Sequence, residues 1–279
     1  MTTTPFDALA CPLDGCPLIA SGTSWRCENG HSFDVARQGY VHLLPVQKKR
    51  TLDPGDSKAM VAARKRFLNA GFYARIAESA SDRALQSLPD EGKGSVLDAG
   101  SGEGYYLRHL AGKAGDKDLA MIGVDISKWA VLAAAKQDKQ TRWVVGSNAN
   151  LPVLPESLDL VLCLFGFPVY GEFARVLKPG GQVIQVDAGA DHLRELREII
   201  YPELKSPGKT DSAAPEGFRQ LDSTVVRFSV TLPDQESIAD LLAMTPHLYR
   251  ASAEGLEKAA ALDSLEVTVD VVLKSWEKS

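Results

Sequence analysis

No stretch of this sequence is long and apolar enough to cross a bilayer. The longest uncharged apolar run, residues 160–170, contains a glycine and a proline, whereas a transmembrane helix needs about 18 apolar residues or more. The first residues have neither a basic start nor an apolar core, so we expect no signal peptide. Cysteine is also scarce: the 279 residues include four, and three of these lie before residue 28. This excludes a disulfide framework and predicts a cytoplasmic protein with no membrane partner.

The sequence also lacks an excess of charge of either sign. Its formal net charge is −5, with 24% charged and 44% hydrophobic residues. This ordinary composition excludes collagen-like, coiled-coil and wholly disordered chains. A length of 279 residues suits one large domain together with a small one.

The average charge hides a basic segment at residues 37–75, which carries nine basic and two acidic side chains. Part of it lies on a predicted helix, residues 58–69, which Ser57 can cap and whose basic side chains are expected to turn largely outward. Because electrostatic attraction is local within roughly 8 Å, such a segment can bind phosphates on an acidic protein. A solvated helix face beside a charged linker is the alternative. The candidate phosphate contacts are Arg37, Lys49, Arg50, Arg64 and Arg66.

Hydrophobic patterning divides the chain into three parts. Residues 1–45 are rich in turn formers, and residues 46–92 combine a basic linker with two predicted helices. In residues 93–279, short apolar strands alternate with helices, which predicts parallel strands joined by crossover helices. The last two strands have little helix between them and predict an antiparallel hairpin at one edge. The expected fold is therefore α/β, with a doubly wound, Rossmann-like sheet of seven strands at residues 95–99, 119–125, 142–146, 158–165, 182–187, 223–231 and 265–274.

A glycine-rich segment, residues 98–104, stands where the first of these strands ends and a helix begins. Small residues suit such a turn because a ligand touches the backbone there and a Cβ would hold it away. One residue separates Gly102 from Gly104, which is not the dinucleotide-binding spacing, and Asp98 precedes Gly100 by two positions. A carboxylate here would repel a pyrophosphate but suits a cationic ligand such as S-adenosylmethionine, which carries an ammonium and a sulfonium. A tight turn with an incidental acid is the alternative.

A second acid, Asp125, ends the next predicted strand. From there it can accept hydrogen bonds from both hydroxyls of a ribose, as the acid of dinucleotide-binding folds does. After the third strand, the amide of Asn148 can contact an adenine. This order of strand, acid, glycine loop, helix, strand and acid resembles that of the class I methyltransferases.

Three cysteines and a histidine near the N-terminus have the loose spacing of a structural zinc site. The predicted ligands are Cys11, Cys16, Cys27 and His31. A segment of about 40 residues with little core has reason to bind a metal, because ligation replaces missing hydrophobic burial. Four residues separate Cys11 from Cys16, more than the usual two, so Asp14 is an alternative oxygen ligand. The alternative interpretation is that the cysteines are free thiols and the histidine is a surface residue, with no metal bound.

Taken together, these features resemble the bacterial 23S ribosomal RNA (guanine-N(1)-)methyltransferases. The likeness runs nearly end to end, and the pairing of a zinc knuckle with a Gly-Tyr-Val segment at residues 39–41 is distinctive. The matching segments are residues 26–45, 49–57, 63–73, 97–106, 174–181, 192–196 and 244–246.

The resemblance implies methyl transfer from S-adenosylmethionine to the ring nitrogen N(1) of a hairpin-loop guanine in 23S ribosomal RNA. It assigns residues 1–45 to a zinc-binding RNA-recognition module, 46–92 to the basic linker and helices, and 93–279 to the methyltransferase domain. On matching positions, the cofactor would also contact Tyr73, Glu103 and His192. The predicted cofactor-binding residues are therefore Tyr73, Asp98, Gly100, Gly102, Glu103, Asp125, Asn148 and His192.

The sequence departs from the family pattern in two places. Asp14 stands where the family has its second cysteine, and after the fourth strand Phe165-Gly-Phe167 precedes Pro168, one position later than the family's proline. No Asp/Asn-Pro-Pro-aromatic motif follows that strand, which argues against transfer to an exocyclic amine. A small-molecule methyltransferase and a non-catalytic RNA-binding protein on the same scaffold are the alternative functions. The sequence does not predict the oligomeric state, and a homodimer is one of the possibilities.

Overall fold

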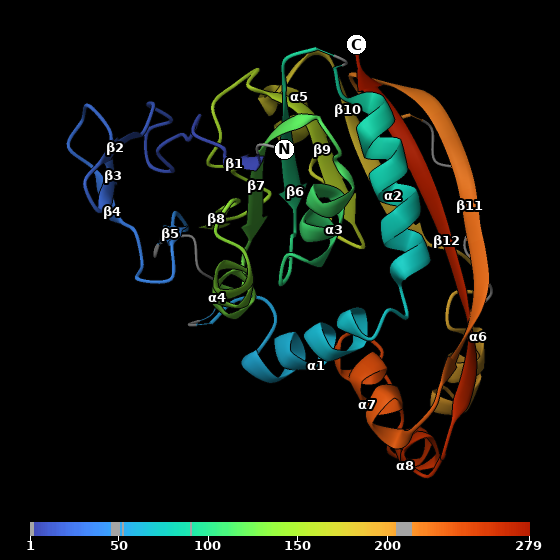
Figure 1. The fold of residues 1–279 in the computed structure, drawn as a ribbon. Helices are drawn as coiled ribbons and strands as arrows, with labels where there is room; N and C mark the ends of the chain where they lie inside the picture. Colours follow the sequence, from blue (N-terminus) through green and yellow to red (C-terminus); the bar gives the residue numbers. More distant parts are fainter. Residues whose placement is uncertain (1–2, 46–50, 52, 90, 205–213) are drawn as a thin grey trace.

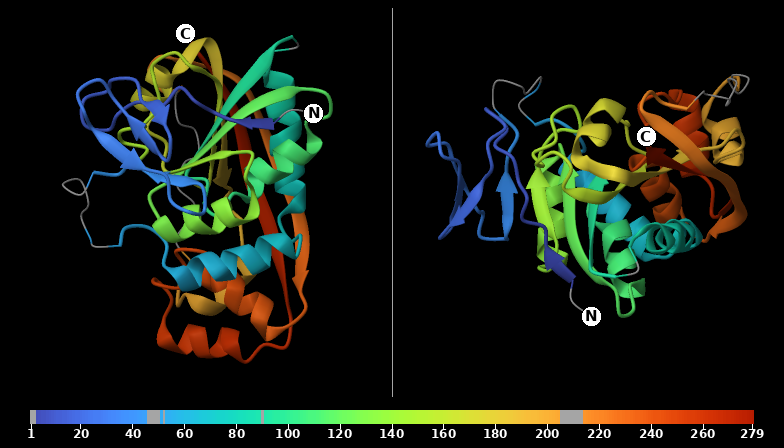
Figure 2. Two further views of the ribbon diagram at one scale, coloured as in Figure 1. Left: turned by 60° about the vertical axis from the view of Figure 1, so that its left-hand side comes forward. Right: turned by 90° about the horizontal axis from the view of Figure 1, so that it is seen from above.

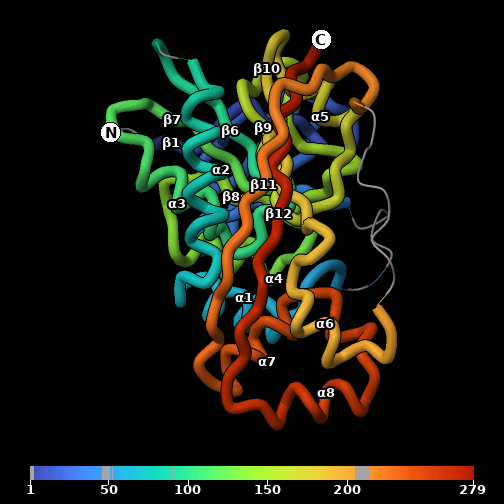
Figure 3. The backbone as a smooth tube through the Cα atoms, turned by 90° about the vertical axis from the view of Figure 1, so that its right-hand side faces the viewer, coloured from blue at the N-terminus to red at the C-terminus, as the bar shows by residue number. Residues whose placement is uncertain are grey.

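The computed structural model describes residues 3–45, 51, 53–89, 91–204 and 214–279 (Figure 1). Five of its strands form the parallel centre of one large sheet, and two long strands extend that sheet antiparallel at one edge. The seven are β6 (Lys93–Ala99), β7 (Asp118–Asp125), β8 (Arg142–Val145), β9 (Leu158–Leu164), β10 (Leu177–Ala188), β11 (Phe218–Leu232) and β12 (Leu265–Lys278). Their spatial order is β11-β12-β10-β9-β6-β7-β8. The predicted doubly wound sheet is confirmed, and Figure 3 shows β11 and β12 side by side along its antiparallel edge. These two strands do not form the predicted hairpin with little helix, because residues 233–264 between them include two helices.

Helices cover the two faces unequally. One apolar cluster combines the sheet with α2 (Ala74–Ser87), α3 (Tyr105–Lys113) and α4 (Lys128–Gln137), while α5 (Tyr170–Val176) packs on the opposite face. At the lower end of the molecule in Figure 1, α1 (Lys58–Asn69) lies between α4 and α7 (Gln235–Ala243). The same end holds α6 (Arg194–Ile200) and α8 (Ala253–Ala260), of which α8 was not expected from the sequence. This end holds the glycine loop.

The helix α1 forms where the sequence predicts it. The Ser57 hydroxyl accepts a hydrogen bond from the Met60 amide (3.3 Å) and so satisfies one N–H group of the first turn. Its buried residues Val61, Phe67 and Leu68 recur at helical spacing and pack on the core.

The N-terminal segment joins the main sheet at two places. Its five strands are β1 (Thr3–Pro5), β2 (Ile19–Ser21), β3 (Ser24–Arg26), β4 (Ser32–Asp34) and β5 (Tyr40–His42). Strands β2, β3 and β4 form a separate small sheet, whereas β1 pairs with β7 and β5 pairs with β8, both in parallel. Figure 2 shows the small sheet standing to one side of the main one. Across this junction, Arg142 donates to the Phe6 carbonyl (3.1 Å), and its guanidinium carbon lies 4.8 Å from the ring centroid of Trp25.

None of the helices in the described ranges is long and apolar enough to span a bilayer.

Candidate cofactor and metal sites

The glycine loop connects β6 to α3 and adopts a backbone that side chains rarely tolerate. Gly100, Gly102 and Gly104 have φ values of +96°, +54° and +83°, in the left-handed region that glycine enters without strain. A Cβ on Gly104 would lie 2.4 Å from the Trp143 ring, so this glycine is required by packing. At Gly100, by contrast, no heavy atom of the described residues, apart from its two chain neighbours, lies within 4 Å of where a Cβ would stand. The loop is therefore open at Gly100 for a ligand to approach the main chain.

Asp98 presents an unusual carboxylate at this loop. The residue is 1% exposed, and its Oδ2 atom has no hydrogen-bond partner among the described residues. Burial raises the pKa of Asp98 to about 8, and the nearby charge of Asp125 adds to the effect. An unpaired buried carboxylate oxygen is costly, so its presence at a glycine loop points to a ligand that partners it. A cationic group fits this site, as S-adenosylmethionine would provide.

Asp125 has a different environment. Its Oδ2 accepts a hydrogen bond from the Gly102 amide (2.9 Å) and its Oδ1 accepts one from the Ser127 amide (2.8 Å). The bond from Gly102 ties the end of β7 to the glycine loop, and the bond from Ser127 orders the turn that follows β7. Burial raises the pKa of Asp125, while the two amide bonds lower it. Because a carboxylate oxygen has more than one acceptor position, both oxygens can still receive a ribose hydroxyl.

The turn before α1 packs against the two residues that follow this acid, a contact that sequence reasoning missed. A Cβ on Gly55, whose φ is +83°, would lie 2.8 Å from Ile126, and the Asp56 carbonyl accepts a hydrogen bond from the Ser127 hydroxyl (2.6 Å). The segment 53–57 thus covers the site beside Asp125. Residues 49–57 were among the segments that resemble the family, but this resemblance did not predict which residues they would contact.

Three rings meet at the carboxyl end of the sheet: Tyr73, Phe165 and His192, here called the aromatic triad. Their centroids lie 5.8–6.0 Å apart. The Tyr73 hydroxyl lies 3.2 Å from Nε2 of His192, and the Asp270 amide donates to Nδ1 (3.3 Å). Burial lowers the pKa of His192 to about 4, so the ring is neutral at pH 7. Since Nδ1 accepts, the proton resides on Nε2 and is donated to the Tyr73 oxygen, which leaves the Tyr73 O–H to donate elsewhere.

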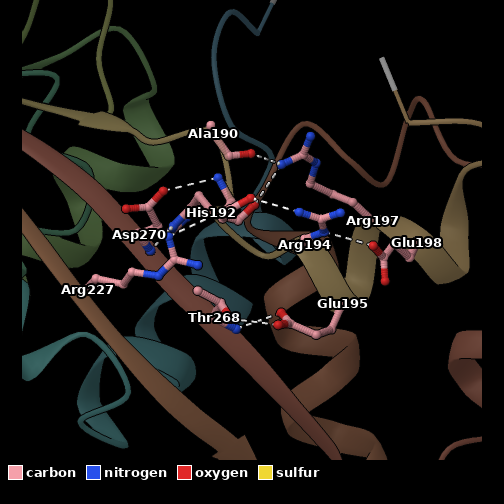
Figure 4. Close-up of polar contacts among 10 residues, drawn as sticks. Ala190, His192, Arg194, Glu195, Arg197, Glu198, Arg227, Thr268 and Asp270 are labelled. Atoms are coloured by element: carbon pink, nitrogen blue, oxygen red, sulfur yellow. Dashed lines mark hydrogen bonds and ion pairs between the residues drawn. The ribbon is translucent and has the colours of Figure 1, made fainter. Parts of the chain in front are cut away.

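The backbone around the triad is held in place from several sides. Figure 4 shows Arg197 reaching the carbonyls of Ala190 (2.8 Å) and His192 (3.2 Å). Phe165 and Leu193 have φ values of +54° and +53°, conformations that cost on the order of 1–3 kcal/mol and gather at functional sites. The strained positions therefore frame the triad.

Two further predicted cofactor residues lie near the loop but differ in environment. The Glu103 side chain is fully buried, where it pairs with Arg108 (3.0 Å) and accepts from Gln137 (2.6 Å). These contacts fasten the loop to α3 and α4, so the Glu103 side chain is not available to a ligand. Asn148 lies half-buried in the turn after β8.

The N-terminal cluster brings together Cys11, Asp14, Cys27 and His31, whose ligand atoms all lie within 4.8 Å of one another. The Cys27 sulfur lies 3.3 Å from Nδ1 of His31, and the Cys11 sulfur lies 3.5 Å from the same nitrogen. Oδ2 of Asp14 lies 3.6 Å from the Cys27 sulfur. A tetrahedral zinc ion places its ligand atoms about 3.3–3.8 Å apart, so this donor set fits zinc.

Cys16, which the spacing favoured, is not part of this group. The Asn29 amide donates to the Cys16 sulfur (3.4 Å) and to Oδ2 of Asp14 (3.0 Å). In the structure Asp14, the oxygen ligand that the sequence left as an alternative, stands among these atoms in place of Cys16, because the turn 12–15 directs its side chain toward them.

The predicted RNA contacts are dispersed. Arg37 is exposed in the turn between β4 and β5, and Lys49 and Arg50 lie outside the described residues. Arg66 forms an ion pair with Asp240 of α7. For Arg64 the expectation of an outward side chain is wrong, since it is only 25% exposed and forms an ion pair with Asp56.

The sheet order, the glycine loop with its buried acid and the zinc-type cluster define a class I methyltransferase with an N-terminal zinc ribbon. Residues 9–52 match the zinc-ribbon family described as "RlmA, N-terminal", and residues 96–181 match the family described as "Methyltransferase domain". The chain is 34% identical to "Putative 23S rRNA (guanine-N(1)-)-methyltransferase YxjB" of Bacillus subtilis, with 96% of each chain covered. It is 32% identical to the 23S rRNA (guanine(748)-N(1))-methyltransferase of Streptomyces fradiae, with 94% of each covered. The chain thus belongs to the 23S rRNA (guanine-N(1)-)-methyltransferase family, as the sequence predicted.

Proposed function

We propose that this protein transfers a methyl group from S-adenosylmethionine to N(1) of a hairpin-loop guanine in 23S ribosomal RNA. Family membership over nearly the whole chain supports the acceptor. The observation that supports S-adenosylmethionine as the methyl donor is the buried oxygen of Asp98, unpaired among the described residues, beside an open glycine loop.

The donor, when bound, supplies an electrophilic methyl group on a sulfonium. Asp98 would hold its ammonium, and Asp125 would receive the ribose hydroxyls. The open main chain at Gly100 allows close approach, which a side chain would prevent. These contacts orient one reactant before the other arrives, and such positioning supplies much of the rate of a bimolecular transfer.

The acceptor would enter beside the aromatic triad. Phe165 and Phe167 are 39% and 89% exposed at the end of β9, and a base stacked on an aromatic ring gains about 1–3 kcal/mol. A guanine in a loop is extruded at lower cost than one inside a duplex. As the methyl carbon bonds to N(1), the carbon–sulfur bond would break with its electron pair remaining on sulfur, which leaves a neutral thioether, and the N(1) proton would pass to water.

The zinc ribbon and basic linker would hold the RNA. Arg37 is exposed on the ribbon, and Lys49 and Arg50 follow it on the chain. We assign residues 1–45 to a zinc-binding RNA-recognition module, 46–92 to the basic linker and its helices, and 93–279 to methyl transfer.

The test is mass mapping of 23S rRNA fragments from a strain lacking the gene. One fragment is expected to be lighter by one methyl group, and the purified protein should restore that methyl group to RNA from this strain. RNA from the parent strain is the matched control, since its acceptor position is already occupied. Asp98→Asn protein should fail to restore the methyl group.

Unchanged fragment masses, together with no transfer to RNA of the deletion strain, would overturn the proposal. Transfer to free metabolites without RNA would favour a small-molecule methyltransferase instead.

A further inference from the structure

Arg64 belongs to α1 but reaches the glycine loop. One of its terminal nitrogens, Nη1, lies 3.6 Å from where a Cβ on Gly102 would stand. The other, Nη2, donates to the Met244 carbonyl at the end of α7 (3.1 Å), and Nη1 pairs with Asp56. The guanidinium is therefore fixed on two sides and presented to the loop.

Arg64 and Asp98 both lie at the glycine loop: Arg64 reaches Gly102, and Asp98 is at the end of β6, where the loop begins. The Tyr106 hydroxyl is buried, which raises its pKa, and smaller effects come from the charges around it. Among these, Arg64 acts to lower the pKa and Asp98 acts to raise it. A guanidinium and an acid whose oxygen is unpaired among the described residues therefore both lie at the glycine loop, close enough to influence the same tyrosine hydroxyl.

This arrangement matches the two charges at the amino-acid end of S-adenosylmethionine. That end carries an ammonium and a carboxylate on one carbon. The ammonium suits Asp98, whereas the carboxylate would be repelled by Asp98 and Asp125 and needs a cation. A guanidinium has five N–H donors, and Asp56 and Met244 use two of those of Arg64 among the described residues.

Resting on the proposed function, we infer that Arg64 binds the carboxylate of the methyl donor and is not a contact to RNA phosphate. Asp56 and the Met244 carbonyl act as positioning groups that hold the guanidinium fork in place. Such prior fixation reduces the side-chain entropy lost when the ligand binds. The basic side chains of residues 37–75 therefore have different roles: Arg64 binds the methyl donor, whereas its neighbour Lys65 is exposed to solvent.

The experiment compares two ligands by titration calorimetry on the full-length protein without RNA. S-adenosylmethionine carries the carboxylate; decarboxylated S-adenosylmethionine lacks it but retains the ammonium and sulfonium. We expect wild-type protein to prefer the carboxylated ligand and Arg64→Gln to lose about 10- to 100-fold in affinity for it, as for a hydrogen bond between charged groups. Affinity for the decarboxylated ligand should change less than about threefold. Arg64→Lys should restore part of the preference.

Lys65→Gln is the matched control, because it removes the same charge one residue away and should leave both affinities unchanged. Circular dichroism and thermal melting verify the fold of each variant. A second readout is the salt dependence of binding to a 23S rRNA hairpin, which Arg64→Gln should not alter.

Equal binding of both ligands by wild-type protein would overturn the inference while donor binding stands. A preference that survives in Arg64→Gln, or a flatter RNA salt dependence in that variant, would also overturn it. If wild-type protein binds neither ligand, the proposed function fails as well.

Discussion

At the scale of residues, the site contains two aspartates whose environments give them different tasks. Asp125 accepts from two backbone amides and so stabilises the loop before any ligand binds. Asp98 is buried with one oxygen unpaired, a state that favours the protonated acid in the free protein. The same residue type therefore builds the loop in one position and awaits a ligand in the other.

Donor affinity should rise with pH because of Asp98. In the folded protein the pKa of Asp98 is raised from 3.8 to about 8. Between pH 3.8 and about pH 8 the folded state therefore holds a proton that the unfolded state has lost. The contribution of Asp98 to the stability of the free protein thus falls as pH rises. A cationic ligand favours the carboxylate, so binding releases that proton. We expect about a tenfold gain in affinity from pH 6 to 7, a range in which the donor's ammonium stays charged. Calorimetry in buffers of different ionisation enthalpy measures the proton release.

Asp98→Asn provides the reference, because any pH dependence that remains belongs to the donor's own ammonium. Equal pH profiles in the two proteins, with no proton release in the wild type, would contradict this role of Asp98.

At the scale of elements, α1 connects parts of the site that lie far apart in the sequence. Its N-terminal turn packs on the residue after Asp125, and its middle reaches Gly102 through Arg64. On its outer side, Arg66 makes two hydrogen bonds to Asp240, which is nearly buried on α7. The helix that precedes Tyr73 thereby links the glycine loop to the C-terminal helices.

A second prediction concerns the zinc affinity of the cluster in the N-terminal zinc ribbon. Asp14→Ala should lower zinc affinity at least about tenfold, since it removes a ligand, whereas Cys16→Ser should retain one zinc ion. Asp14→Cys should bind zinc more tightly, because a thiolate is the softer ligand. Competition with a chromophoric chelator measures the affinities. The reverse result, loss in Cys16→Ser and retention in Asp14→Ala, would assign the fourth ligand to Cys16.

At the scale of the whole molecule, the ribbon and the methyltransferase sheet share a core. Leu9, Trp25 and Val41 belong to the same buried apolar cluster as Val124 and Val144 of the sheet. Together with the pairing of β1 and β5 to the sheet, this favours cooperative unfolding of the two parts.

We therefore expect a single calorimetric unfolding transition for the full-length protein. Deletion of residues 1–45 would leave the edge of β8 unpaired and expose apolar side chains, so the truncated protein should aggregate or lose its cooperative transition. Calorimetry and size-exclusion chromatography measure both properties. A soluble truncated protein with an unchanged melting temperature would show that the ribbon is an independent domain.

The sequence by itself determined the features that depend on neighbouring residues. The Ser57 cap, the seven strands and the glycine loop follow from local spacing and backbone preference, and each includes its predicted position or lies within about five residues of it, with β10 and β11 starting five residues early. The sequence did not predict the short helix α8, because only Gly255 and Ala259 are buried in it and they give little hydrophobic periodicity.

Only the tertiary structure decided which side chains meet across the chain. The hydrogen bond of Tyr73 to His192 joins residues 119 apart, and the bond of Arg64 to Met244 joins residues 180 apart. Local patterning predicts that α1 is a helix but not which of its basic side chains faces the glycine loop. That choice depends on acceptors brought there by α7 and the preceding turn, just as the choice of Asp14 over Cys16 depends on how one turn folds toward the distant Cys27 and His31.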